Sequence, residues 1–279
     1  MNHPLTPLRL TPFRIGAALL SSAFLIISAT ADPTPPIISA TDLAARLNGL
    51  QQDGNSFVRL RLEVKQPPGT TKLALQLQIK ERRTKSSTDV LYQVLWPKER
   101  KGEAVLLRKV ANQPAGGSLF VPPDTVHPLG SSQMKEGLFG SDVSYEDILE
   151  NFYTWEQQAL VGTDVLNRVR CQILESKSAK ANHSSYASVR TWVDPRRLVP
   201  LRIEKYYVSG QLARRIDFSN LARDDNHRLI PANLTVQGQR PDSVTDLAGS
   251  RITHNVVYAD RDFSPEALKE LAAPPPPPK

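Results

Sequence analysis

The sequence predicts a mainly β protein: a strongly curved antiparallel sheet of about ten strands that forms an incomplete β-barrel, with helices covering its concave side. Apolar and polar residues alternate with a period of two in about ten segments, and turn-forming residues separate many of them. The strands do not alternate with helices, as they would in a parallel sheet. The 279 residues are enough for one large β domain.

The N-terminal residues predict a secretory signal peptide at 1–31. Two arginines precede an apolar run at 15–27, and the small residues Ala29-Thr30-Ala31 follow it, so we expect cleavage after Ala31 and a periplasmic location. The run is shorter than the roughly 20 residues that cross a bilayer. We divide the rest into a Pro-rich spacer (32–38), a folded domain (39–272) and a disordered polyproline tail (273–279).

The folded domain begins with a predicted amphipathic helix. Leu43, Leu47 and Leu50 recur at helical spacing after Thr41 or Ser39, either of which suits an N-cap. Alternation then replaces the helical period, and each alternating segment predicts one strand. These segments are 56–65, 71–82, 89–97, 103–110, 167–176, 185–194, 198–208, 211–221, 227–238 and 250–260.

Residues 111–143 interrupt the alternation with glycine, proline and scattered apolar residues. We expect a long irregular insertion, either a variable surface loop or a lid over a binding site. A second helix should follow, because Ser144 and Asp147 have the spacing of a capping box. Its apolar side would contain Tyr145, Ile148, Leu149 and Phe152.

The acidic residues of this block, Asp142, Glu146, Asp147 and Glu150, raise the question of an acid/base pair. Neighbouring positions of a helix point apart and do not converge on one substrate, so we interpret these carboxylates as helix-starting residues and do not expect an enzyme. A short last helix is predicted after Ser264, an N-cap followed by proline.

Charge, cysteine and histidine content argue against nucleic-acid binding, an internal disulfide and a metal site. Without Arg9 and Arg14 of the signal peptide, the 35 basic residues fall to 33 against 28 acidic residues, a formal charge of +5, and no nucleic-acid motif is present. Cys171 is the only cysteine, so no internal disulfide forms. No cofactor motif is found, and we expect no metal site because the histidines are isolated. They are His3, His127, His183, His227 and His254.

Two blocks of the sequence carry a family resemblance. The G-S-D-x-S-Y-E-D block at 140–147 and the W-V-D-x-x-x-x-x-P-L-R-I-E segment at 192–204 resemble the outer-membrane lipoprotein-sorting family, the LolA-like proteins, over about 91–271. The resemblance implies an open barrel whose apolar cavity shelters acyl chains in the periplasm. It agrees with the architecture that the alternation predicts.

We therefore expect a monomeric periplasmic protein that binds acyl chains of lipids or lipoproteins for transport or sorting to the outer membrane. The alternative is an envelope lipid sensor, or a scaffold that docks an inner-membrane transporter. The candidate cavity and lid residues are apolar side chains of the early strands, the insertion and the second helix; the same residue types also fill ordinary cores. They are Leu73, Leu75, Leu77, Tyr92, Val94, Trp96, Phe120, Met134, Leu138, Phe139, Tyr145, Ile148, Leu149 and Phe152.

Overall fold

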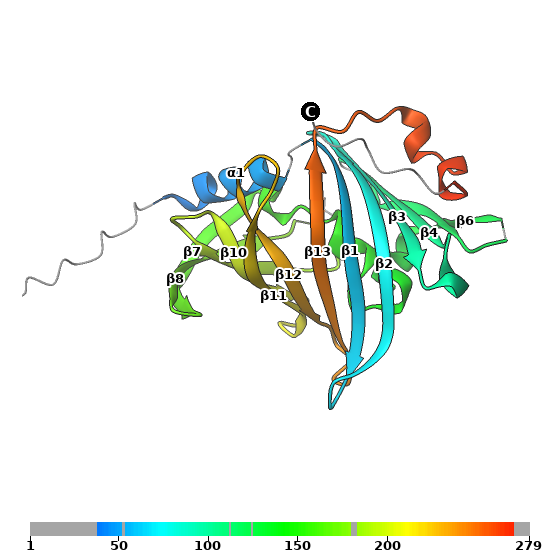
Figure 1. Ribbon diagram of the computed structural model, residues 1–279. Helices are drawn as coiled ribbons and strands as arrows, with labels where there is room; N and C mark the ends of the chain where they lie inside the picture. Colours follow the sequence, from blue (N-terminus) through cyan, green and yellow to red (C-terminus); the bar gives the residue numbers. More distant parts are fainter. Residues whose placement is uncertain (1–37, 52–53, 112, 124, 180–182, 271–279) are drawn as a thin grey trace, which may run out of the picture. The chain divides into compact units, whose positions relative to one another are not determined.

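A computed structural model describes residues 38–51, 54–111, 113–123, 125–179 and 183–270, all within one compact unit (Figure 1). The expected signal peptide, all but the last residue of the spacer, and the proline tail lie outside the described residues. None of the helices among the described residues is long and apolar enough to cross a membrane.

The described residues form a single sheet of thirteen antiparallel strands. Its order is β6-β5-β4-β3-β2-β1-β13-β12-β11-β10-β9-β8-β7, so the first strand pairs with the last, and the ends of the order, β6 and β7, remain edges. Figure 1 shows β13, β1 and β2 side by side, with the two halves of the sheet on either side of them. The strands are β1 (Asn55–Gln66), β2 (Thr70–Arg83), β3 (Ser87–Trp96), β4 (Ala104–Val110), β5 (Gly116–Phe120), β6 (Val126–Leu129), β7 (Gln157–Leu166), β8 (Val169–Lys177), β9 (Ser188–Asp194), β10 (Val199–Tyr206), β11 (Leu212–Arg223), β12 (Leu229–Gln237) and β13 (Val244–His254).

Three strands exceed the predicted ten. Strands β5 and β6 lie within residues 111–143, so the segment expected to be an irregular insertion contributes these strands to the sheet. Gly117 permits this pairing, since a Cβ at that position would approach the Leu106 carbonyl oxygen to 2.2 Å. The third, β7, shows little alternation because most of its side chains are exposed at the edge. The last predicted strand was also misplaced, because β13 covers 244–254 rather than 250–260.

The helices are shorter than predicted, except the first. Helix α1 (Ala40–Gln51) begins after Ser39, whose Oγ accepts a hydrogen bond from the Asp42 N–H at 3.1 Å. Helix α2 (Tyr145–Leu149) has the predicted capping box but ends before Phe152. The helix expected after Ser264 is a single 3₁₀ turn, η7, and another 3₁₀ turn, η6, precedes Ser264. The 3₁₀ segments are η1 (Lys98–Arg100), η2 (Ser131–Lys135), η3 (Leu138–Gly140), η4 (Phe152–Thr154), η6 (Asp260–Phe263) and η7 (Glu266–Leu268).

Three apolar clusters pack on the sheet. The first joins β1–β4 to η2, η3 and α2; the second joins α1 and η4 to β8–β11. Both lie on the same face of the sheet. Leu62 of the first cluster leads across β13 and β12 to Phe218 of the second through directly paired residues, which share a face. These pairs are Leu62–Leu247, Leu247–Leu234 and Leu234–Phe218. The third covers the opposite face of β3 and β4 with η6 and η7. Helical segments therefore lie on both faces, not on one as predicted.

Candidate functional site

Most of the predicted acyl-site residues meet in the first cluster. Strands β2 and β3 contribute Leu75, Leu77 and Val94, whose side chains have no exposed surface. Residues 131–149, which we name the strap, cover them, and we name the combined cluster the strap cluster. Its central side chains pack as in an ordinary protein core, and open pockets of about 240 and 410 Å³ lie at its borders, the first lined by Met134 and Leu149 and the second by Leu73 and Phe139. The predicted residues within it are Leu73, Leu75, Leu77, Tyr92, Val94, Met134, Leu138, Phe139, Tyr145, Ile148 and Leu149.

Three predicted residues lie elsewhere. Trp96 is 51% exposed, because the pairing of β2 with β3 shifts between Gln76 and Leu77 and takes Trp96 out of the alternation. Phe120 packs in the third cluster, on the opposite face of the sheet. Phe152 belongs to η4 and packs with α1 in the second cluster.

The strap is fastened by the carboxylate of Asp147. Its Oδ1 accepts hydrogen bonds from Lys205 Nζ at 2.8 Å and from the Tyr186 hydroxyl at 2.7 Å, and its Oδ2 accepts one from Arg214 Nε at 2.7 Å. The side chains of Asp147 and Lys205 are 3% and 2% exposed. This residue therefore both caps α2 and ties the helix to β10 and β11 through a buried ion pair.

The same surroundings fix the charge of Asp147. Burial by itself raises the pKa of a carboxyl group, but the positive charges of Lys205 and Arg214 and the hydrogen bonds that Asp147 accepts outweigh burial. The pKa of Asp147 is therefore held well below its usual range. Burial next to Asp147 raises the pKa of the Tyr186 hydroxyl, so the tyrosine stays protonated and donates to the carboxylate.

A second carboxylate, Asp142, fastens the middle of the strap. Its Oδ1 accepts from Arg240 Nη2 at 2.7 Å, and its Oδ2 accepts from the hydroxyls of Ser243 and Thr245 at 2.7 and 2.8 Å. Both aspartates belong to the acidic block that the sequence singled out. Their buried carboxylates make ion pairs that hold the strap in place.

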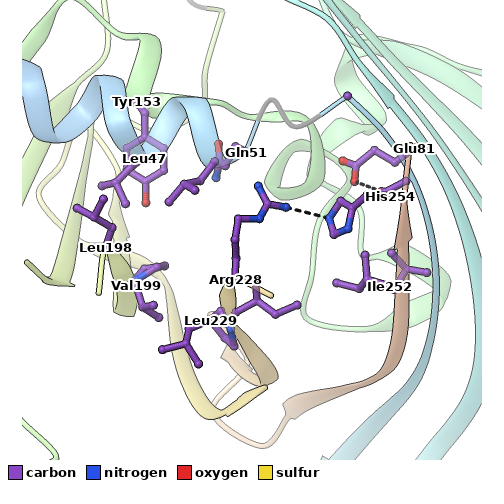
Figure 2. A pocket seen from close by; sticks show the side chains of 17 residues that line it. Leu47, Gln51, Glu81, Tyr153, Leu198, Val199, Arg228, Leu229, Ile252 and His254 are labelled. Carbon is purple, nitrogen blue, oxygen red and sulfur yellow. Dashed lines mark hydrogen bonds between the residues drawn. The ribbon is translucent and has the colours of Figure 1, made fainter. Parts of the chain in front are cut away.

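An open cavity lies beside the strap cluster, between α1 and strands β1, β10, β12 and β13 (Figure 2). We name it the α1 cavity; its volume is about 290 Å³. In Figure 2, Leu47, Leu198, Val199 and Leu229 form an apolar wall, and Ile252 faces them from β13. A cavity with such walls suits an apolar ligand of modest size.

One side of the α1 cavity is polar. The Arg228 side chain extends across it in Figure 2, and its Nη2 donates to His254 Nε2 at 3.3 Å. The same guanidinium holds the buried Asp224 carboxylate from Nε and Nη2, at 3.0 and 2.9 Å. Beside it, the Ser56 hydroxyl donates to Glu81 at 3.2 Å. The cavity therefore combines an apolar wall with a hydrogen-bonding end, the arrangement that an amphiphile requires.

Among the described residues, one group of side chains that could act as metal ligands adjoins this polar end. The ligand atoms of Asp224, Asp225 and His254 lie within 4.8 Å of one another. Arg228 already neutralises Asp224, and the His254 backbone N–H donates to Asp225 at 2.7 Å. The hydrogen bonds of His254 contribute to lowering the pKa of Asp225 against the effect of its partial burial. We assign this group the role of holding the β11–β12 turn against β13.

Comparison of the sequence with known families identifies the family of this chain. A family model described as "-like: Uncharacterized protein" matches residues 86–270. No protein with a curated description matches the sequence.

Solved structures share the fold at low sequence identity. A DUF1329 family protein from Desulfovibrio piger is 21% identical with a TM-score of 0.75, and the match covers 84% of this chain and 100% of that one. A putative outer membrane lipoprotein-sorting protein domain from Vibrio parahaemolyticus is 18% identical, with a TM-score of 0.73 and coverage of 83% and 98%. A LolA superfamily protein from Nitrosomonas europaea is 17% identical, with a TM-score of 0.65 and coverage of 82% and 98%. The chain therefore belongs to the family of that model, and its fold is that of the LolA-like outer-membrane lipoprotein-sorting proteins.

Proposed function

We propose that this protein binds the acyl chain of a lipid or lipoprotein in the α1 cavity. The observation that supports this most is the cavity itself, an open apolar space with a polar end in a fold shared with lipoprotein-sorting proteins. Each methylene group that leaves water for such a site contributes roughly 0.8 kcal/mol, so even a partly buried chain binds favourably. Binding of this kind needs no covalent step and no cofactor.

The two sides of the cavity give the ligand an orientation. Leu47, Leu198 and Leu229 offer apolar surface to the chain, whereas Arg228 and His254 lie where a polar head group would sit (Figure 2). Burial of a polar head group is costly unless it forms hydrogen bonds, and this end of the cavity carries hydrogen-bonding side chains, so an amphiphile fits the cavity. The centre of the strap cluster, where the sequence placed the acyl site, would admit a chain only if the strap moved away from β2 and β3.

The wider role that we propose is transport or sorting of acylated cargo to the outer membrane by a periplasmic monomer. The face of the sheet that carries α1 and α2 would be the concave side that shelters the chain, and an inner-membrane transporter would supply the cargo. A sensor would bind lipid without releasing it, and a scaffold would bind none. Lipid binding is therefore the first property to measure.

Native mass spectrometry of protein purified gently from the periplasm, followed by lipid extraction, tests the proposal. We expect a bound acyl species, and we expect Ile252→Trp to abolish it by filling the cavity. The matched control is Val208→Trp, which adds the same ring at a hairpin tip where the native side chain is 90% exposed. A protein that takes up no added lipopeptide or fatty acid, with both variants folded, would overturn acyl binding and leave the scaffold role.

A further inference from the structure

Four arginines lie together at one end of the sheet, away from the strap. Arg168 lies in the turn between β7 and β8, Arg170 is an exposed residue near the start of β8, and Arg196 and Arg197 lie in the turn between β9 and β10. Strand β8 pairs with both β7 and β9, and Gln172 is the partner of Val193, so the two turns project from the same end of the sheet. We name these residues the arginine end.

The arginine end has an excess of positive charge. Residues 164–170 and 192–198 contain these four arginines and two aspartates. Asp194 accepts hydrogen bonds from the backbone of its own turn and lies 3.7 Å from the Arg197 guanidinium. Asp164 accepts from Trp192 Nε1 at 3.0 Å. Arg168 and Arg170 are exposed and form no ion pair with any residue in the described ranges.

Apolar side chains accompany these charges. Val165 is 60% exposed and is the cross-strand partner of Arg170, and Val161 on the same edge strand is 46% exposed. Exposed apolar residues among cations are typical of surfaces that bind the head-group region of a membrane. Anionic lipids attract such clusters over about a Debye length.

The arginine end adjoins the α1 cavity. Leu198 and Val199 directly follow Arg197 in the chain, and both lie on the cavity wall in Figure 2. Helix α1, which provides Leu47 on the same wall, packs against β7 and β8. A surface that the arginines hold on a membrane would therefore place the cavity close to that membrane.

We propose that the arginine end docks onto membrane surfaces that contain anionic phospholipid, with Val165 inserted among the head groups. Charge complementarity and the neighbouring apolar cavity favour a lipid surface over an acidic protein as the partner. The docking needs only the surface residues, so it is separate from acyl binding in the cavity.

Vesicle flotation tests this docking. We expect the full-length mature protein to float with vesicles of equal parts phosphatidylcholine and phosphatidylglycerol, and not with phosphatidylcholine alone, with binding that weakens as salt is added. The variant Arg168→Glu/Arg170→Glu should bind about 30-fold more weakly, since each basic residue near an anionic surface contributes to attraction. The matched control Lys98→Glu/Lys101→Glu makes the same charge change in exposed residues of the β3–β4 connection and should bind as the wild type does.

The outcomes separate this proposal from the proposed function. Equal binding by the arginine variant and the control, or no binding of the wild type to anionic vesicles, would overturn docking, and the second result would favour an acidic protein partner. Ile252→Trp should float like the wild type although it binds no acyl chain. Unchanged melting temperatures of all three variants would show that the fold is intact.

Discussion

The strap cluster and the α1 cavity lie on the same face of one sheet, yet the centre of the first is covered and the second is open. Over β1–β4, the strap is fixed by Asp142 and Asp147, and its side chains fill the space above Leu75 and Leu77. Beside it, α1 packs on β7, β8 and η4 rather than on β12 and β13. The space between α1 and those strands is the cavity.

The difference shows that composition alone does not distinguish a core from a binding site. Both regions are lined by leucine, isoleucine and valine, and both face the interior of the fold. What differs is the covering segment. Buried ion pairs hold the strap down, whereas α1 is attached through a narrow apolar stripe of Leu43, Ala44 and Leu47 and leaves Leu50 41% exposed at the cavity.

The largest expected effect comes from releasing the strap. Asp147→Ala leaves Lys205 buried without its carboxylate, so we expect a loss of about 3–5 kcal/mol in the free energy of unfolding, measured by urea denaturation. The control is Asp217→Ala, which removes the partly exposed pair with Arg202 and should cost about 0–1 kcal/mol. Equal costs for the two variants would contradict the role of Asp147 in holding the strap.

Truncation of apolar side chains should separate core from cavity. Leu77→Ala creates a void in the filled cluster and should lower the free energy of unfolding by about 2–5 kcal/mol, with little change in acyl affinity. Leu229→Ala enlarges a space that is already open and should cost about 1 kcal/mol while weakening acyl binding several-fold. Denaturation and a fluorescent fatty-acid titration measure the two effects. The reverse pattern of affinities would place the ligand under the strap.

The smallest effect is expected from pH. The pKa of Asp147 is lower in the folded protein than in the unfolded chain, so its contribution is complete above the unfolded pKa of about 3.9 and is lost as pH falls through the folded pKa. The strap should therefore stay closed between pH 8 and 5. Hydrogen exchange of the 138–147 amides tests this. Increased exchange at pH 5 that is absent in Asp147→Asn would contradict it.

The sequence predicted most of the fold because alternation is a direct signal of a half-buried strand. It missed β5, β6 and β7, where glycine, proline or edge exposure removes that signal. It predicted the capping box of Ser144 and Asp147, which depends on neighbours three residues apart. It did not predict that Lys205 and Arg214 also hold Asp147, because those contacts join distant segments of the chain.

The candidate site was harder to predict for the same reason. The α1 cavity is formed by residues from separated segments, among them Leu47, Leu198, Leu229 and Ile252, and no local pattern connects them. The predicted set instead followed strands with clear alternation, whose apolar side chains the strap covers. Only the position of α1 relative to β12 and β13 reveals the cavity.

The measurement that tests the account most directly is photo-crosslinking with a fatty acid that has a diazirine in its chain, followed by mapping of the labelled peptides. We predict labels on the α1 cavity, at Leu47, Leu229 and Ile252, and loss of labelling in Ile252→Trp but not in Val208→Trp. Labels on Leu77, Phe139 and Leu149 instead would show that the chain enters beneath the strap, and would contradict the assignment of the α1 cavity as the binding site.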